Sequence, residues 1–156
     1  MQVLINADVH EKGTFNAQDA INNIKKDPNY SKTGAIALFI GVVRGETFEN
    51  EKVEKLIIEG YEEKAKEVLT KISNDLVQKH GIVNVQIHHL LGEFNVGDDL
   101  VYVAVAGSHR TDVFPVLREA VERYKSEAPV FKKEYITDTK GSHLEYWVSE
   151  KEVHRQ

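Results

Sequence analysis

The sequence predicts an α+β fold in which strand hairpins and amphipathic helices are mixed. Several segments alternate apolar and polar residues with a period of two, as half-buried strands do, and others repeat apolar residues at helical spacing. Their order does not match regularly repeating βαβ units. With 156 residues, 41% of them hydrophobic, the chain can bury a substantial core. We therefore expect a single domain over residues 1–156, with a charged tail at about 149–156 that frays.

A strand and a short helix are predicted first. "QVLINADVH" alternates, with Val3, Ile5, Ala7 and Val9 on one parity. In "FNAQDAINNIKKDPNY", Asn16 is a suitable helix N-cap and Pro28 closes the helix.

The segment "GAIALFIGVVRG" is apolar on both parities over residues 35–43, which predicts a central strand covered on both faces. Gly45 ends it, so Arg44 lies where a buried strand surfaces. A polar connection, "ETFENEK", leads to a second strand in "VEKLIIEGY", and a hairpin is the simplest link between the two.

The most regular helical pattern is "EEKAKEVLTKISNDLVQKHG", where Ala65, Val68, Leu69, Ile72 and Leu76 share one side and Gly81 follows the last turn. "IVNVQIHHLLGEF" then alternates, and an "NVGDD" turn joins it to the apolar "LVYVAVAG". These two segments predict another hairpin.

A third helix is predicted in "SHRTDVFPVLREAVERYKSEAP", with Val113, Leu117, Ala120 and Tyr124 in one stripe and Pro129 as its end. Pro115 lacks an N–H group and fits best in a first turn, so we expect the N-cap at Thr111 or Asp112. Two further strands around the turn "TDTKGSH" complete the chain.

Composition excludes several classes of function. The net charge of -5 disfavours binding to nucleic-acid phosphates or anionic lipids. The chain has no cysteine, so it offers no thiolate metal ligand, no cysteine nucleophile and no persulfide. Its first residues lack the pattern of a secretory signal, and no apolar run approaches the length of a membrane span. We therefore expect a cytoplasmic protein.

Two places in the sequence are candidates for binding an anion. "AGSHR" ends an apolar strand and opens a helix, so His109 and Arg110 would lie beside free helix N–H groups. Arg44, at its own strand end, offers two parallel donors. Ordinary explanations stay open, because Ser108 could cap the helix beside surface residues and Arg44 could extend to solvent.

The stretch "YKSEAPVFKKEY" concentrates positive charge in an acidic chain. Pro129 forces a change of direction that can bring Lys125 and Lys132 to one pocket. If Phe131 and Tyr135 face the core, Lys132 faces outward beside Glu134. Attraction to the helix dipole explains Lys125 alone, and protection of an edge strand explains the strand lysines, so both interpretations remain open.

Histidine gives no sign of a metal site. His88 and His89 are adjacent and would face opposite sides of a strand, and His89 shares the apolar parity of a core residue. Neither has carboxylates at ligand spacing. We predict no metal and no cofactor.

Five stretches in order resemble the large, catalytic subunit of molybdopterin synthase: "FIGVVRG", "IEGYEEKA", "IHHLLGEFNVGD", "VAVAGSHR" and "APVFKKE", followed by "LEYWV". The similarity runs from about Gly34 to Val148. It implies an α/β-hammerhead-like domain with additional antiparallel β structure.

The resemblance to this family implies that the chain is a sulfurtransferase of molybdenum cofactor biosynthesis. Its members convert cyclic pyranopterin monophosphate to molybdopterin with sulfur from the C-terminal glycine thiocarboxylate of a small ubiquitin-like partner. Two large subunits form a central homodimer and each binds one small subunit, giving a heterotetramer. A chain without cysteine agrees with sulfur supplied by a partner.

Carried over residue by residue, the resemblance makes Lys125 and Lys132 the catalytic candidates. It also implies a substrate-binding set made of Val42, Val43, Arg44, His109, Arg110, Lys125, Lys132, Lys133 and Glu134. Val42, Leu90 and Glu127 stand where some members carry positive charge, so the electrostatics of the pocket differ in detail.

Two alternatives share the fold. One is a noncatalytic module that binds a phosphorylated metabolite. The other is a scaffold that docks a ubiquitin-like protein without chemistry.

Overall fold

A computed structural model describes residues 5–148, so Val3 and the predicted fraying of residues 149–156 lie outside it. The elements within this range are β1 (Ala7–Glu11), α1 (Ala17–Lys25), a short 3-10 helix (Tyr30–Lys32), β2 (Ala35–Val42), β3 (Lys52–Gly60), α2 (Glu62–Val77), β4 (Ile82–Asn95), β5 (Asp99–Gly107), α3 (Arg110–Glu127), β6 (Val130–Thr137) and β7 (His143–Val148).

The strands form one sheet in the order β2-β5-β4-β3-β6-β7, with β1 added beside β4. Only the β1–β4 pair is parallel among the described strands, and the other ladders are antiparallel. The predicted hairpins β4–β5 and β6–β7 are both present. The α+β class predicted from the sequence is therefore confirmed.

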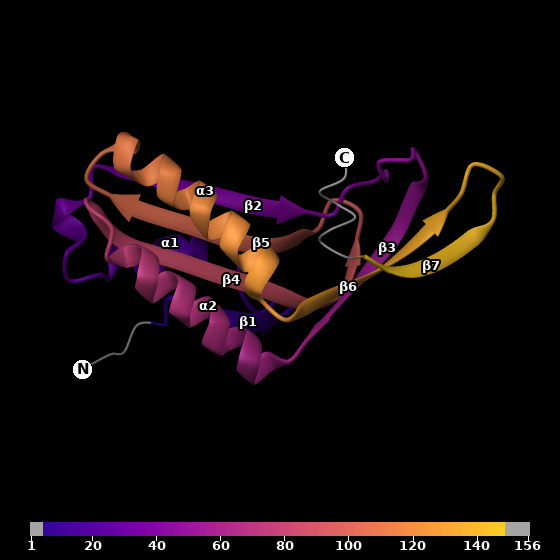
Figure 1. The fold of residues 1–156 in the computed structure, drawn as a ribbon, viewed down its shortest axis with the longest axis horizontal. Coiled ribbons are helices and arrows are strands. Elements are labelled where there is room, and N and C mark those ends of the chain that lie inside the picture. The colour runs from indigo at the N-terminus through magenta and orange to yellow at the C-terminus, as the bar shows by residue number, and fades with distance from the viewer. Residues whose placement is uncertain (1–4, 149–156) are drawn as a thin grey trace.

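Strand β4 belongs to both halves of this sheet. Its residues up to Leu91 pair with β1 and β5, whereas Gly92–Asn95 pair with Ile58–Lys55 of β3. At the change of partner, Gly92 has a φ of 130°, a conformation that favours glycine. Beyond this point β3, β6 and β7 project away from the part of the sheet that the helices cover (Figure 1).

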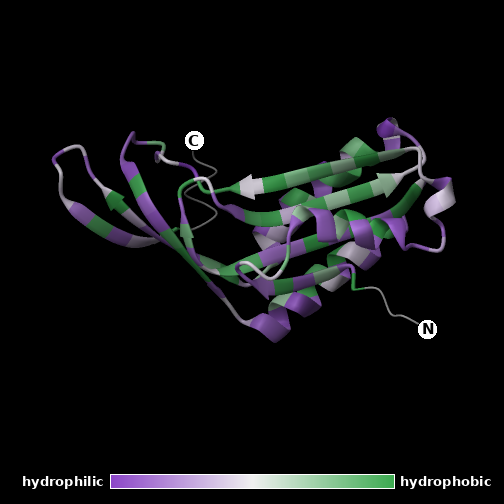
Figure 2. Cartoon of the chain, turned by 180° about the vertical axis from the view of Figure 1, so that it is seen from behind, coloured by the Kyte–Doolittle hydropathy of each residue, from purple (hydrophilic) through white to green (hydrophobic). Residues whose placement is uncertain are grey.

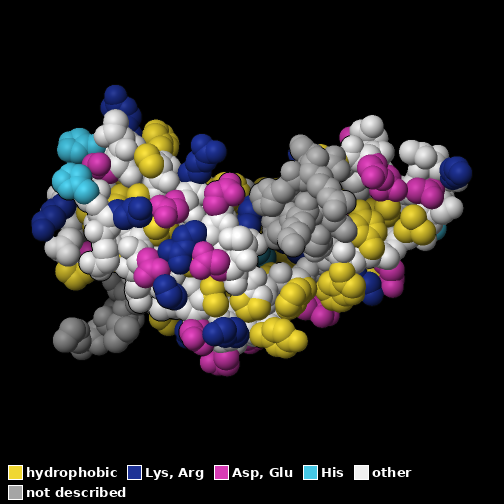
Figure 3. Space-filling model, viewed as in Figure 1, with side chains coloured by type: hydrophobic (Ala, Val, Ile, Leu, Met, Phe, Trp, Pro, Cys, Tyr) yellow, Lys and Arg dark blue, Asp and Glu magenta, His cyan; other side chains and the backbone are white. Residues whose placement is uncertain are grey.

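Helices α2 and α3 lie side by side on one face of the sheet, and α1 covers part of the other face (Figure 1). The predicted stripe of α3 is confirmed, because Val113, Ala120 and Tyr124 are buried in the core. Outward, α2 and α3 carry Lys/Arg and Asp/Glu side chains in mixture (Figure 3), including the Arg123–Asp75 and Arg123–Glu127 ion pairs. No helix among residues 5–148 is both long and apolar enough to cross a membrane.

Helix α3 begins earlier than predicted. Its N-cap is His109, whose side chain makes no cap hydrogen bond, so neither Thr111 nor Asp112 caps the helix. Pro115 consequently lies in the second turn, where it removes one backbone hydrogen bond from a helix of 18 residues. Packing of the buried stripe outweighs this local cost, a balance that local pattern does not reveal.

Two expectations about β2 are wrong. It pairs with β5 and not with β3, to which the following loop connects only through a bridge between Glu46 and Lys52. It is also an edge strand, and one of its faces leaves Leu38, Ile40 and Val42 exposed. Figure 2, from behind, shows hydrophobic positions along β2 with no helix in front of them.

The polar parity of β4 is buried as well as its apolar parity. The ring of His88 bonds to His10 at 2.9 Å and to Gln86 at 2.8 Å. The amide of Gln86 donates to Asn84 at 2.7 Å, and the amide of Asn84 donates to Asp27 at 2.8 Å. This network satisfies polar groups that β1 and α1 cover.

We predict that the two buried histidines make the protein sensitive to mild acid. Burial, with repulsion from His10, lowers the pKa of His88 to about 3, and burial, aided by nearby lysines, lowers that of His89 to about 4. In the unfolded chain both histidines bind a proton near pH 6.5, whereas in the folded protein they remain neutral. The free energy of unfolding is therefore highest above pH 6.5 and decreases as the pH falls below it. Urea unfolding at pH 7.5 and 5.0 should differ by about 4 kcal/mol.

The control for this prediction is the exposed His80. His80→Gln should keep the full pH dependence, whereas His89→Gln should lower it by about half. An equal pH dependence in the wild type and the His89 variant would contradict the assignment.

We also predict that Gly92→Ala lowers stability by about 1–3 kcal/mol, because alanine is strained at this positive φ. Gly13 is a matched control, since its φ of 89° and the open space around it give the same kind of strain in the β1–α1 connection. Chemical unfolding should show a loss in both variants. Gly92 lies where β4 changes partner, so only Gly92→Ala should also lower the sulfur-transfer activity per folded molecule that the family resemblance implies. Equal activity in the two variants would contradict a role for Gly92 in aligning the two parts of the sheet.

Candidate active site

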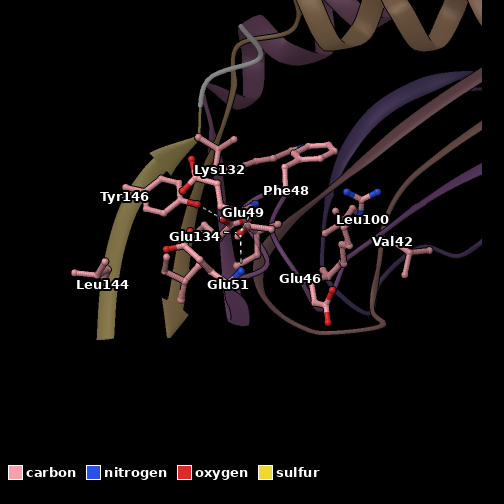
Figure 4. A pocket seen from close by; sticks show the side chains of 16 residues that line it. Val42, Glu46, Phe48, Glu49, Glu51, Leu100, Lys132, Glu134, Leu144 and Tyr146 are labelled. Atoms are coloured by element: carbon pink, nitrogen blue, oxygen red, sulfur yellow. Dashed lines mark hydrogen bonds between the residues drawn. The ribbon is translucent and has the colours of Figure 1, made fainter. Parts of the chain in front are cut away.

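A cavity of about 650 Å³ lies between the β6–β7 hairpin and the loop that follows β2. Its apolar lining includes Leu56, Leu100 and Ile136. Charged side chains also line it, namely Arg44, Glu46, Glu49, Glu51, Lys132 and Glu134 (Figure 4). The cavity thus combines an apolar wall with charges of both signs.

Strand β6 directs Lys132 into this cavity. Ile136 is 1% exposed and shares its parity with Lys132 and Glu134, whereas Phe131 is 46% exposed. The condition considered from the sequence, with Phe131 and Tyr135 facing the core, is therefore not met. Phe131 packs edge-on against the exposed Tyr61, at 5.9 Å between ring centroids, and the lysine side faces the cavity.

Lys125 and Lys132 both lie near the buried ring of His89. Tyr124, the neighbour of Lys125 on α3, has its ring centroid 5.8 Å from that of His89. Burial is the main cause that lowers the pKa of His89 to about 4, and the charges of Lys132 and Lys125 lower it further. The Nδ1 atom of His89 lies 2.9 Å from the carbonyl oxygen of Leu90, so a proton on Nδ1 keeps the neutral ring hydrogen-bonded. Lys125 and Lys132, on either side of the bend at Pro129, are thus both close enough to His89 for their charges to lower its pKa.

Arg44 reaches the same cavity from the loop after β2. Its guanidinium is 4.7 Å from the ring centroid of Phe48, a cation–π geometry. Beside it, Val42 is exposed and Val43 is buried, and both contribute to the lining. Arg44 therefore lies at the same end of the sheet as Lys132.

His109 and Arg110 lie at the other end of the sheet. β2 and β5 are antiparallel, with Ala35 opposite Gly107 and Val42 opposite Asp99. Because His109 follows β5 and Arg44 follows β2, the length of β2 separates them, roughly 25 Å. Both His109 and Arg110 are exposed, and neither lines the cavity. Within one chain, the predicted anion ligands are divided between two places.

Lys133 and Glu134 are adjacent in sequence, but their side chains lie on opposite faces of β6. Glu134 lines the cavity, whereas Lys133 points to the opposite face of β6 and pairs with Glu145 at 3.1 Å. That hydrogen bond is the main reason why the pKa of Lys133 is raised. The structure brings together Lys132, Glu134 and Arg44 but directs Lys133 away from them.

Sequence reasoning missed several side chains of the cavity. Phe48, Glu49 and Glu51 belong to a segment treated only as a polar connection, and Tyr146, although part of the stretch "LEYWV", was not proposed as a site residue. Tyr146 stands directly opposite Glu134 in the β6–β7 ladder. Correct strand parity would have placed Tyr146 in the cavity, but no local signal marks the loop residues.

The arrangement is suited to binding anions and stabilising negative charge. Lys132 and Arg44 line this partly apolar cavity, where charge-assisted hydrogen bonds are strong, whereas Lys125 is not among the lining residues. No cluster of three histidine or carboxylate side chains with metal-binding geometry occurs among residues 5–148. Ammonium and guanidinium groups are therefore the electrophilic elements that the described residues supply at the cavity.

Comparison with known proteins gives consistent results. The "Molybdopterin synthase catalytic subunit" of Pyrococcus abyssi is 37% identical over 134 residues, which cover 86% of this chain and 84% of the relative. The crystal structure of molybdopterin synthase from Staphylococcus aureus superposes with a TM-score of 0.75 at 27% identity, covering 91% of this chain and 96% of that one. The fold also matches, at 19% identity and a TM-score of 0.65, a chain in the complex of subunits 1 and 2 of molybdopterin-converting factor from Helicobacter pylori, with 88% of each chain covered.

These relatives favour an enzyme over a metabolite-binding module or a docking scaffold. The family model described as "MoaE protein" matches residues 10–127, well over half of the chain. The chain therefore belongs to the MoaE family, the catalytic subunits of molybdopterin synthase, which are sulfurtransferases of molybdenum cofactor biosynthesis.

Proposed function

We propose that Lys125 and Lys132 carry out sulfur transfer to cyclic pyranopterin monophosphate in the cavity beside β6. The observation that carries this proposal is that Lys132 lines a cavity that Arg44 also reaches. Lys125 ends α3 next to Tyr124, whose ring centroid lies 5.8 Å from that of His89. Surface lysines that only protect an edge strand would point to solvent, whereas Lys132 lines the cavity.

The reaction requires positive charge at two moments. A thiocarboxylate is an anion, and its sulfur must be held against the carbon of the pterin side chain that it attacks. To release the donor, water adds to its acyl carbon, and the acyl oxygen gains negative charge that a nearby ammonium group stabilises. The carbon–sulfur bond then breaks, which leaves a carboxylate on the donor and the sulfur on the pterin. Lys125 and Lys132 can divide these tasks, and a neutral His89 adds no third positive charge to the pair.

A small ubiquitin-like partner supplies the sulfur in this proposal. Its C-terminal tail would enter the cavity along the apolar lining made by Leu56, Leu100 and Ile136, with the thiocarboxylate toward Lys132. The relative from Helicobacter pylori was solved as a complex of two subunits, which supports such a partner. The absence of cysteine fits a sulfur donor on another chain. The cytoplasmic location expected from the sequence is part of the same proposal.

A second copy of the chain would complete the site. β2 has a free edge and exposes Leu38, Ile40 and Val42. If two copies pair antiparallel along β2 about a two-fold axis, the Arg110 end of one strand lies beside the Arg44 end of the other. His109 and Arg110 of one copy would then bind the phosphate of a substrate whose reacting carbon faces the lysines of its partner. Two such copies, each with one small subunit, give a heterotetramer.

Lys125→Ala and Lys132→Ala should each reduce molybdopterin formation by about 100-fold, because each removes a charge that stabilises the transition state. Purified variants are mixed with the thiocarboxylated small subunit and cyclic pyranopterin monophosphate, and molybdopterin is quantified. Lys140→Ala, in the exposed turn between β6 and β7, is the control and should keep wild-type activity. Full activity of both site variants would refute the assignment, and wild-type protein that binds both reactants without product would refute the reaction.

Arg110→Ala should weaken binding of the pterin about tenfold or more while leaving the affinity for the partner unchanged, because it removes a charge-assisted hydrogen bond to phosphate. Calorimetric titration with each reactant separately measures the two affinities. Weaker binding of the partner with unchanged binding of the pterin would contradict this role.

Mixing variants tests whether the site is shared between copies. Arg110→Ala and Lys132→Ala proteins, each of low activity, are combined, dissociated and reassociated. If the site spans two copies, random pairing restores about a quarter of wild-type activity, since half of the dimers then hold one intact site out of two. If one copy supplies all groups, mixing restores nothing.

A further inference from the structure

Glu134 and Tyr146 form a cross-strand pair on the wall of the cavity. They stand opposite each other in the β6–β7 ladder, and the Tyr146 hydroxyl donates to Glu134 Oε1 at 2.5 Å. Figure 4 shows the two side chains pointing toward each other from neighbouring strands, with Lys132 nearby on β6. Because Lys132 and Glu134 share one face of β6, the pair is adjacent to a proposed catalytic lysine.

The Tyr146 hydroxyl remains a donor throughout the working pH range. Its pKa is raised first by burial, then by the hydrogen bond to Glu134 and by the charge of that carboxylate. Glu51 and Glu49, on the loop that forms the other wall, raise it further. The negative charges of Glu49, Glu51 and Glu134 therefore all disfavour ionisation of the Tyr146 phenol, which stays protonated.

One oxygen of Glu134 accepts this hydrogen bond from Tyr146. Among the described residues the carboxylate has no ion pair and no hydrogen bond besides the one from Tyr146. A carboxylate has room for several donors. The carboxylate of Glu134 thus lines the cavity as a hydrogen-bond acceptor. The hydrogen bond from Tyr146 on the opposite strand restricts the rotation of the Glu134 side chain.

We propose that Tyr146 is a positioning residue of this site: its hydroxyl holds Oε1 of Glu134, so that the second oxygen accepts an N–H group of a reactant beside Lys132. This inference rests on the proposed sulfur transfer. Two sources of such a donor enter the cavity, the N–H groups of the pterin ring and the backbone amides of the partner's tail. Both match the same acceptor, and the affinities of the two reactants distinguish them.

Tyr146→Phe removes the hydroxyl and keeps the ring. Loss of one hydrogen bond to a charged group corresponds to about a tenfold effect, and we expect the affinity for one reactant to fall by about that factor. Weaker binding of the pterin identifies the ring as the donor, and weaker binding of the small subunit identifies its tail.

Tyr102→Phe is the matched control. The hydroxyl of Tyr102 also donates to a carboxylate, that of Asp99 at 2.8 Å, but neither residue lines this cavity. Both variants lose a bond of the same type, so they should lose similar stability. Only Tyr146→Phe should lose affinity and turnover, and an equal loss in the two variants would mean that Tyr146 has a structural role alone.

A double-mutant cycle with Glu134→Ala tests whether Tyr146 acts through Glu134. Once the carboxylate is absent, removing the hydroxyl should have no further effect on the affinity for the reactant. A full tenfold effect of Tyr146→Phe in the Glu134→Ala background would overturn the proposal, as would unchanged affinities in Tyr146→Phe itself.

The cycle is measured in binding constants as well as in turnover. A wild-type protein without turnover would contradict the proposed function, while the binding cycle would still decide the role of Tyr146.

Discussion

The change of partner along β4 is the constraint on which the site depends. Helix α3, which carries Lys125, packs on β5, β4 and β2, whereas β6, which carries Lys132, is joined to the sheet through β3. These two parts share β4, and the chain bends at Gly92, where β4 passes from one to the other. The direction that β4 takes at this residue therefore sets how closely the two lysines approach. His89 lies three residues before the bend and contacts Tyr124, so the buried ring supports the same junction.

Charge in the cavity is balanced by neutral and anionic groups that surround the lysines. Two ammonium groups near one buried ring repel each other in a region of low dielectric constant. Burial keeps His89 neutral, and carboxylates such as Glu134 lie on the cavity wall. In the proposed reaction both reactants are anions, and Arg44 and Lys132 are the cationic groups of the cavity lining that can bind them among its four carboxylates.

Much of the fold could be predicted from the sequence because the patterns involved are local. Asn16 caps α1 as expected, and the turn after Asn95 joins β4 to β5. The failures concern non-local contacts. The sequence left open which parity of β6 faces the core, and Ile136 is the residue that reaches it, because the neighbouring β3 presents its own apolar residues on that side. The partner of β2 lies more than fifty residues away along the chain, where spacing gives no signal.

The site was predicted in part for the same reason. Pro129 is a local feature, and it indicated the change of chain direction between α3 and β6; Lys132 lines the cavity, whereas Lys125 does not. The grouping of Arg44 with His109 and Arg110 came from the resemblance and does not exist within one chain, since they stand at opposite ends of β2. An antiparallel pairing of two copies turns this separation into proximity. β2 is apolar on both parities, although its face with Leu38, Ile40 and Val42 is open in the single chain. In the proposed arrangement this strand would lie at the contact between copies. Sulfur transfer would then depend on association of the chain with itself as well as with its partner, and dilution below the dissociation constant of the dimer would remove the phosphate ligands before it unfolded the protein.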